Sequence, residues 1–158
     1  MEIVIDFQGF KDNNNEFIIK ELAVRPLNRK FAIHKIVLPP FEYETLDYEK
    51  RKEVQWLYLF YHGLQWDSGS EPYDTMLYEL KELCYFCKKI YVKGEEKAHF
   101  LRALLQREVI ELGALGCPSV KELSSEYLCV FHREKKNNNY VCALDNAYKL
   151  KTWILGNK

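Results

Sequence analysis

The segment "EIVIDFQGFKDNNNEFIIKELAV" (Glu2 to Val24) has the pattern of two strands joined by a turn. Its two flanks, residues 2–10 and 16–24, are rich in β-branched and aromatic residues, which favour strands. The intervening "KDNNN" is typical of a turn, because Asn and Asp tolerate left-handed backbone. The stretch therefore predicts an antiparallel hairpin. Residues 30–40 ("KFAIHKIVLPP") predict a third strand that stops at the Pro-Pro pair.

Downstream of the hairpin the pattern changes to alternating helices and strands. Helical spacing begins at Tyr48 and is expected to stop at Gly63, and a second helix is expected over 74–89 with Asp74 as its N-cap. A strand (90–94), a helix (95–107), a strand (108–113), a helical turn (119–123) and a last helix (143–155) follow. This order predicts one α/β domain over residues 1–158, with a five-stranded mixed sheet flanked by helices. It is also the element order of the ribonuclease H-like fold.

Composition excludes several broad classes. The chain has 158 residues, 47% hydrophobic and 15% aromatic, which is typical of a folded globular domain. Its 23 basic and 23 acidic residues give no net charge, so nucleic acid would need a local basic patch. No hydrophobic run is long enough to cross a membrane, and no secretory leader is visible. The five cysteines are therefore expected to be reduced thiols in the cytoplasm or nucleus.

One segment near the end combines metal-binding residue types. In "YLCVFHREKKNNNYVCALDNA" (Tyr127 to Ala147), Cys129 and His132 form a Cys-x-x-His pair, and Cys142 follows before the last helix. Zinc prefers four tetrahedral ligands, and Cys-x-x-His lets two of them reach one ion across a turn. The alternative is that both cysteines are ordinary buried residues and that His132 lies on the surface beside "REKK".

The chain resembles the DEDDh branch of 3′–5′ exonucleases over nearly its whole length, but not at the catalytic positions. That family opens with Asp-x-Glu on the first strand, where this chain has Asp6 and Gln8. Leu101 lies in the region of the second motif, and Val141 and Asn146 replace the histidine and aspartate of the last motif.

These losses bear on the chemistry that the resemblance implies. Two-metal phosphodiester cleavage needs several carboxylate oxygens around a pair of divalent cations. One aspartate beside neutral amides is a poor substitute, so we expect no conventional two-metal exonuclease. The alternative is an active Mg²⁺- or Mn²⁺-dependent nuclease on single-stranded RNA or DNA, which uses Asp6 with displaced acids from Asp145, Glu95 and Glu96.

The chain is also similar to the Maelstrom domain of the piRNA pathway. That domain carries a Glu-Cys-His-Cys zinc set, and the matching residues here are Glu2, Cys129, His132 and Cys142. The resemblance extends to "KGEEKAHFL" and "LGCPSVKEL", and the opening is similar to that of insect, insect-virus or transposon-encoded proteins. It implies a structural zinc that ties the first strand to the last helix, with Glu111 or Cys117 as replacements for Glu2. It also implies RNA binding or protein scaffolding in small-RNA or transposon silencing, with single-stranded RNA or proteins as partners.

Other polar residues allow a functional and a structural interpretation. Four lysines either line a groove that follows the phosphates of a nucleic acid or belong to an ordinary charged surface: Lys93, Lys97, Lys149 and Lys151. The Cys-x-x-Cys at Cys84 and Cys87 falls on an expected helix, which favours core packing over metal or redox chemistry. His62 and Trp66 could line a groove but are expected in the core. His99 is expected to be solvated or packed.

Overall fold

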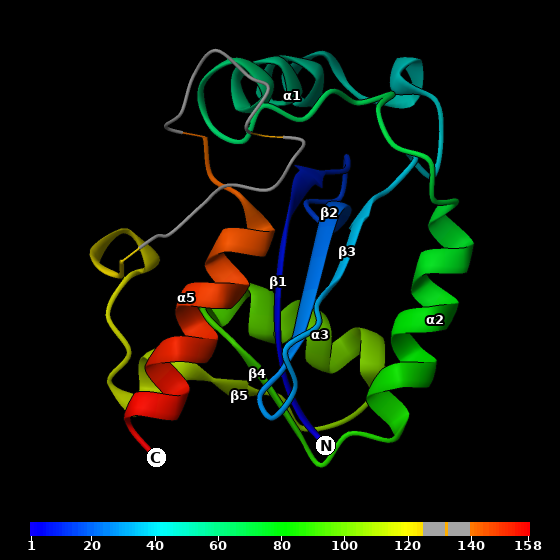
Figure 1. Cartoon of the computed structure of the whole chain (residues 1–158). Helices are drawn as coiled ribbons and strands as arrows, with labels where there is room; N and C mark the ends of the chain where they lie inside the picture. The colour runs from blue at the N-terminus through cyan, green and yellow to red at the C-terminus, as the bar shows by residue number, and fades with distance from the viewer. Residues whose placement is uncertain (125–131, 133–139) are drawn as a thin grey trace.

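A single five-stranded sheet forms the centre of the molecule (Figure 1). The computed structural model describes residues 1–124, 132 and 140–158. The strands follow the order β3-β2-β1-β4-β5: β1 is antiparallel to β2 and β2 to β3, and the pairs β1–β4 and β4–β5 are parallel. The predicted mixed sheet is thereby confirmed. The strand bounds are β1 Glu2–Lys11, β2 Phe17–Pro26, β3 Ile33–Ile36, β4 Lys89–Val92 and β5 Ile110–Glu111.

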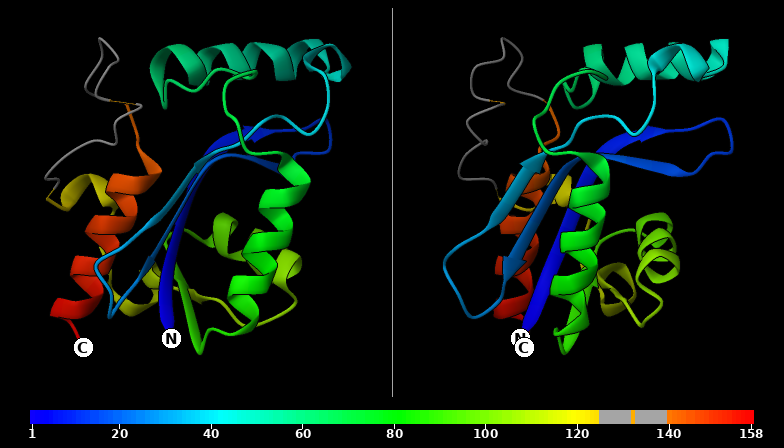
Figure 2. Two further views of the ribbon diagram at one scale, coloured as in Figure 1. Left: turned by 45° about the vertical axis from the view of Figure 1, so that its right-hand side comes forward. Right: turned by 90° about the vertical axis from the view of Figure 1, so that its right-hand side faces the viewer.

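Helices cover both faces of the sheet (Figures 1 and 2). The α2 and α3 helices pack on one face, α5 packs on the other, and α1 lies across one end. Their bounds are α1 Tyr48–Phe60, α2 Tyr73–Tyr85, α3 Glu95–Leu105 and α5 Ala143–Gly156, with short 3₁₀ turns η1 (Tyr43–Thr45), η2 (Leu112–Leu115) and η3 (Val120–Glu122). Among the described residues, no helix is both long and apolar enough to cross a membrane.

The alternation of side chains along β1 divides the core between the two faces. Ile3, Ile5 and Phe7 point to the face that Met76 of α2 and Leu101 of α3 cover. Val4 points to the opposite face, where it joins a cluster with residues of α5. The next side chains on that second face, Asp6 and Gln8, are polar and buried. The sheet therefore has a polar layer beneath the start of α5.

A β-bulge adjusts the hairpin at this polar layer. The register of β1 and β2 shifts between Gln8 and Gly9, so that Gln8 pairs with Glu21 and Gly9 pairs with Ile19. Lys20 consequently has no partner across the pair. The backbones approach so closely that a Cβ at Gly9 would lie 1.9 Å from the Ile18 carbonyl oxygen. Only glycine fits at this point of the bulge.

Several element boundaries differ from the sequence prediction. The third strand covers only Ile33–Ile36 of the expected 30–40, and α1 ends at Phe60 rather than at Gly63. Pro72, not Asp74, precedes the first turn of α2, so Asp74 lies inside the helix. The α2 helix ends at Tyr85 rather than at residue 89, so Cys87 lies outside it. Cys84 and Cys87 both pack in the main core, as expected.

Candidate metal centre and the surroundings of Asp6

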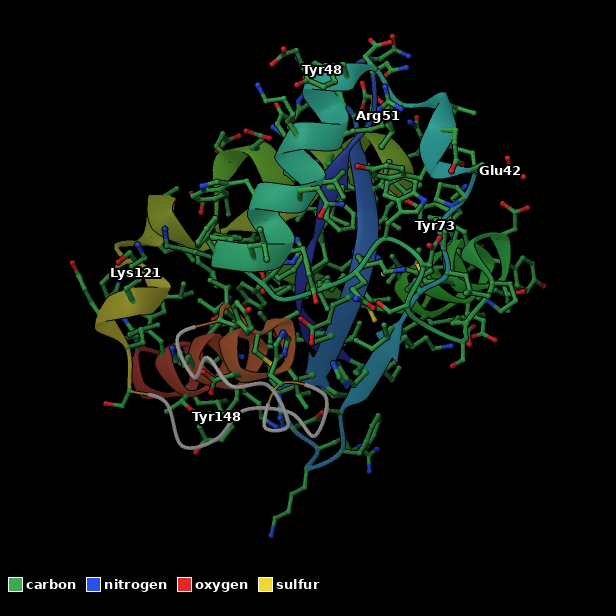
Figure 3. The ribbon with its side chains drawn as sticks, turned by 90° about the horizontal axis from the view of Figure 1, so that it is seen from above. Glu42, Tyr48, Arg51, Tyr73, Lys121 and Tyr148 are labelled. Carbon is green, nitrogen blue, oxygen red and sulfur yellow. The ribbon has the colours of Figure 1, made fainter. Side chains whose placement is uncertain are left out.

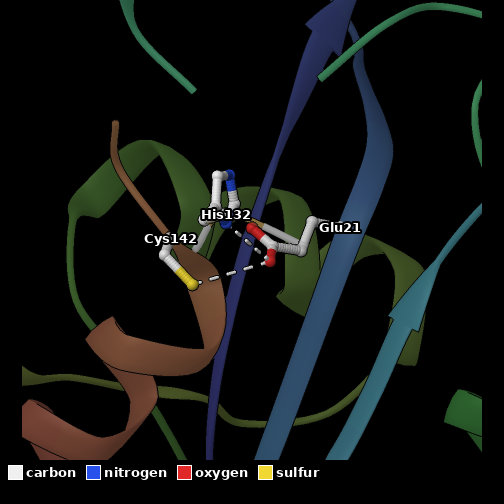
Figure 4. Close-up of side chains that lie close together, drawn as sticks. All are labelled: Glu21, His132 and Cys142. Carbon is white, nitrogen blue, oxygen red and sulfur yellow. Dashed lines mark hydrogen bonds and ion pairs between the residues drawn. The ribbon is translucent and has the colours of Figure 1, made fainter. Parts of the chain in front are cut away.

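Three buried side chains of metal-binding type converge beside the start of α5 (Figure 4). Glu21 comes from the middle of β2, Cys142 directly precedes α5, and His132 comes from the segment before it. One ligand atom from each lies within 4.8 Å of the other two. Glu21 and His132 are fully buried, and Cys142 is nearly so. The fold thus brings residues separated by more than a hundred positions to one point.

Glu21 is held as a carboxylate by its neighbours. Its Oε1 accepts a hydrogen bond of 2.8 Å from the backbone N–H of Ala143, and its Oε2 lies 2.8 Å from Nε2 of His34. Burial raises the pKa of Glu21, but His34, His132 and the Ala143 amide together lower that pKa below its ordinary value. The side chain therefore carries a negative charge inside the protein, which a cation in the cluster would offset.

Hydrogen bonding orients the His132 ring toward Glu21. Its Nε2 lies 2.7 Å from the backbone carbonyl oxygen of His62, which can only accept, so Nε2 carries a proton. Nδ1 is then the ring nitrogen that faces the cluster, 3.7 Å from Oε2 of Glu21. Burial opposes the charged imidazole, yet Cys142 and Glu21 raise the pKa of His132 above its ordinary value. A histidine whose second nitrogen donates to a carbonyl is the usual arrangement of a metal ligand.

The donor set fits zinc. A thiolate, an imidazole nitrogen and a carboxylate oxygen are the three ligand types that zinc takes from proteins. The Cys142 Sγ and the His132 Nδ1 each lie 3.7 Å from Oε2 of Glu21, less than the roughly 4.2 Å that two zinc–ligand bonds can span. This buried group could hold a metal ion. Cys129, the predicted partner of His132, lies outside the described residues.

The structure does not bring Glu2 to this cluster. Glu2 lies at the start of β1, where its Oε1 accepts hydrogen bonds from Tyr91 Oη at 3.1 Å and Lys158 Nζ at 3.0 Å. Glu21 pairs with Gln8, six residues further along β1, which corresponds to about 20 Å of strand. The carboxylate of the cluster is therefore Glu21 rather than the predicted Glu2.

The two predicted replacements for Glu2 have other roles. Glu111 accepts hydrogen bonds from the backbone N–H groups of Gly94, Gly113 and Ala114, and so joins α3 to η2. Cys117 packs in the hydrophobic cluster beneath α5, with its thiol toward the carbonyl of Pro118. Neither belongs to the cluster of Glu21, His132 and Cys142.

The sequence "FIIKELAV" contains a feature from which a buried polar role of Glu21 can be predicted. Charged residues are rarely buried unless they are paired. Lys20 and Glu21 interrupt an otherwise apolar strand, and both prove to be almost fully buried. A charged pair in such a strand marks positions where the interior needs polar partners.

Asp6 lies beside this cluster on the same face of the sheet, and its carboxylate is already occupied. Its Oδ1 accepts a hydrogen bond of 2.8 Å from Lys97 Nζ, and its Oδ2 accepts from Asn146 Nδ2 at 3.1 Å and from Gln8 Nε2 at 3.3 Å. The side chains of Asp6, Gln8 and Asn146 are all buried. A lysine ammonium and two amides thus take the positions around Asp6 that divalent cations would need.

The displaced acids are engaged elsewhere in the structure. Asp145 pairs with Lys149 at 3.4 Å, Glu95 pairs with Arg102 at 3.0 Å, and Glu96 pairs with Lys11. None of these contacts involves Asp6. Of the other positions compared with the exonuclease motifs, Leu101 is a fully buried core residue, and the backbone N–H of Val141 donates to the Tyr61 carbonyl oxygen. The described residues form no cluster of carboxylates around Asp6.

Three of the four lysines expected to track phosphates contact their own chain. Lys97 pairs with Asp6, Lys149 pairs with Asp145, and Lys151 donates to the backbone carbonyl oxygen of Arg29. Lys93 is half-buried. Of the other histidines, His99 is exposed, whereas His62 is buried with its Nε2 3.0 Å from the Gly9 carbonyl oxygen.

Fold and site define a mixed α/β protein with a buried Glu-His-Cys group suited to a metal ion. No protein-family model matches the chain, and no curated protein matches it in sequence.

Proposed function

We propose that this chain is a ribonuclease H-like domain of exonuclease ancestry that has lost two-metal catalysis and acts as a binding scaffold. A structural zinc on Glu21, Cys129, His132 and Cys142 would stabilise it. The observation that supports the loss of catalysis is that the Asp6 carboxylate accepts hydrogen bonds from Lys97, Gln8 and Asn146. The order of three antiparallel strands followed by two parallel ones supports the ancestry.

The buried donor set supports the structural role of the metal. A closed site of four protein ligands leaves no open position for water or substrate, which is typical of structural zinc. The ligands would join β2 to the segment before α5, next to the amides that surround Asp6. The metal would then stabilise the face of the sheet that carries Asp6, which is where a related nuclease would have its catalytic carboxylates.

Protein partners fit the surface better than a phosphate-tracking groove. The candidate lysines are mostly engaged within the chain, whereas α1 exposes large apolar side chains, among them Trp56, Leu59 and Phe60. Exposed clusters of aromatic residues are characteristic of interaction sites. The resemblance to the Maelstrom domain supports a setting in small-RNA or transposon silencing.

The test is incubation of the purified protein with labelled single-stranded RNA in Mg²⁺ or Mn²⁺. We expect no cleavage by the wild-type protein, by Asp6→Ala or by Asp74→Ala, which removes an exposed acid outside the site. Cleavage by the wild type that Asp6→Ala abolishes and Asp74→Ala retains would overturn the proposal. RNA binding at low salt that decreases in Lys93→Ala would assign RNA rather than protein as the partner.

A further inference from the structure

A second pocket lies apart from the metal centre, between α1, η1 and the loop of residues 64–70. Its volume is about 660 Å³, within the range of small-molecule sites. In Figure 3, Tyr48 and Arg51 mark the start of α1, and Glu42 marks the side of η1. Four aromatic rings line the pocket: Phe41, Tyr43, Tyr58 and Trp66.

The rings are arranged around Trp66. The ring centroid of Phe41 lies 5.5 Å from that of Trp66 at an interplanar angle of 51°, and that of Tyr43 lies 6.0 Å away at 67°. Trp66 is only 5% exposed and belongs to the core, so the rings that reach solvent in this pocket are those of Phe41, Tyr43 and Tyr58. The face of an aromatic ring attracts cations through its quadrupole.

The charged groups that line the pocket all have the same sign. They are the carboxylates of Glu42, Glu44 and Asp67, and no lysine, arginine or histidine is among the described lining residues. None of the three carboxylates forms an ion pair within the described part of the chain. The charges of Glu42 and Glu44 are therefore available to a cation that enters from solvent, whereas Asp67 also interacts electrostatically with the ammonium of Lys20.

Basic groups occur close to the pocket but are not among its described lining residues. Lys20 lies behind the loop, where its Nζ donates to the backbone carbonyl oxygens of Trp66, at 2.6 Å, and Ser68. Arg51 and Lys52 line a separate apolar groove on α1. The charged side chains that line the pocket itself are thus all acidic.

We propose that this pocket binds an alkylated ammonium group, the headgroup that choline and the side chain of methylated lysine share. Aromatic faces replace the weak hydration of such a cation, and the carboxylates neutralise its charge. The residues involved are distinct from the metal ligands and from the surroundings of Asp6, so the pocket and the scaffold function can be tested separately.

The first test is calorimetric titration of the full chain with choline, with a short trimethyl-lysine peptide and with 3,3-dimethylbutan-1-ol, the uncharged isostere of choline. We expect saturable binding of at least one cation, and binding of the isostere about tenfold weaker or worse because it lacks the charge. Tighter binding of the peptide would identify a modified protein as the source, and tighter binding of choline a small molecule. The absence of binding by both cations at millimolar concentration, or equal binding of the isostere, would overturn the proposal.

The second test removes the acids without touching the core. The triple variant Glu42→Gln, Glu44→Gln, Asp67→Asn should lose about tenfold or more in cation affinity. The control Glu49→Gln, Glu82→Gln, Glu122→Gln makes the same change of net charge at exposed positions outside the pocket and should bind as the wild type does. Equal losses in the two triple variants would indicate a general charge effect and would contradict the proposal.

Discussion

At the scale of single residues, Asp6 is a buried carboxylate that forms an ion pair with Lys97. It is 2% exposed, and Lys97 supplies the only full charge that its hydrogen bonds contact in the described structure. Without Lys97 the buried carboxylate would keep only its two amide donors. Lys97 is partly exposed, which limits the strength of the ion pair.

Lys97→Met should therefore destabilise the protein by about 1–3 kcal/mol, because it leaves a buried charge without its counterion. The double variant Asp6→Asn, Lys97→Met should be less destabilised than the sum of the single variants. Urea unfolding of the four proteins provides the measurement. Additive effects would show that the two side chains do not interact.

The buried Lys20 should raise the free energy of unfolding as the pH rises. A lysine in an ion pair usually has the opposite effect. Burial lowers the pKa of Lys20 from 10.5 to about 8. Between these values the unfolded chain binds the proton and the folded chain does not, so the free energy of unfolding rises with pH across this window. The full rise corresponds to about 3 kcal/mol.

The wild type should show this rise between about pH 8 and 10.5 when compared with Lys20→Met, which cannot titrate at this position. Lys52→Met, which removes an exposed lysine, should keep the wild-type slope. Equal slopes for the wild type and Lys20→Met, measured by urea unfolding at each pH, would contradict this account of Lys20.

At the scale of elements, the sequence predicts best those strands and helices whose residue pattern is clear within the segment itself. The hairpin was predicted almost to the residue, because β-branched runs flank a turn of Asn and Asp. The last strand was expected over 108–113, yet only Ile110–Glu111 pair. Its length depends on β4, which offers Tyr91 and Val92 as partners, and such distant pairing leaves little trace in local sequence.

The site was predictable only in part, for the same reason. His132 and Cys142 stand out by residue type and spacing. Glu21 reaches them because the bulge at Gly9 sets the register of β2 and because α5 packs over it, and both causes are non-local. The neutralisation of Asp6 by Lys97 likewise joins residues 91 positions apart.

The bulge itself can be tested with a matched pair of glycines. Gly9→Ala should destabilise the protein by about 1–3 kcal/mol, because its Cβ would overlap the Ile18 carbonyl oxygen and force the hairpin apart. Gly156→Ala places a Cβ in open space at the end of α5 and should be neutral or slightly stabilising. Thermal unfolding measures both, and a neutral Gly9→Ala would contradict the close approach of the strands.

At the scale of the whole molecule, the proposed metal links parts that are distant in sequence. Glu21 belongs to the first hairpin, whereas His132 and Cys142 belong to the last quarter of the chain. An ion that binds only the folded state stabilises by mass action, by about 4 kcal/mol at a thousandfold excess over its dissociation constant. Removal of zinc by a chelator should therefore lower Tm by about 8 °C or more.

The most direct test of the central claim is the metal content of the protein, purified without chelators and measured by inductively coupled plasma mass spectrometry. The wild type and Cys117→Ser, which removes a cysteine outside the cluster, should each contain about one zinc per chain. Glu2→Gln should do the same, whereas His132→Asn and Cys142→Ser should lose the ion. A wild-type protein without zinc, or a Cys142→Ser variant that retains a full equivalent, would contradict the metal centre described above.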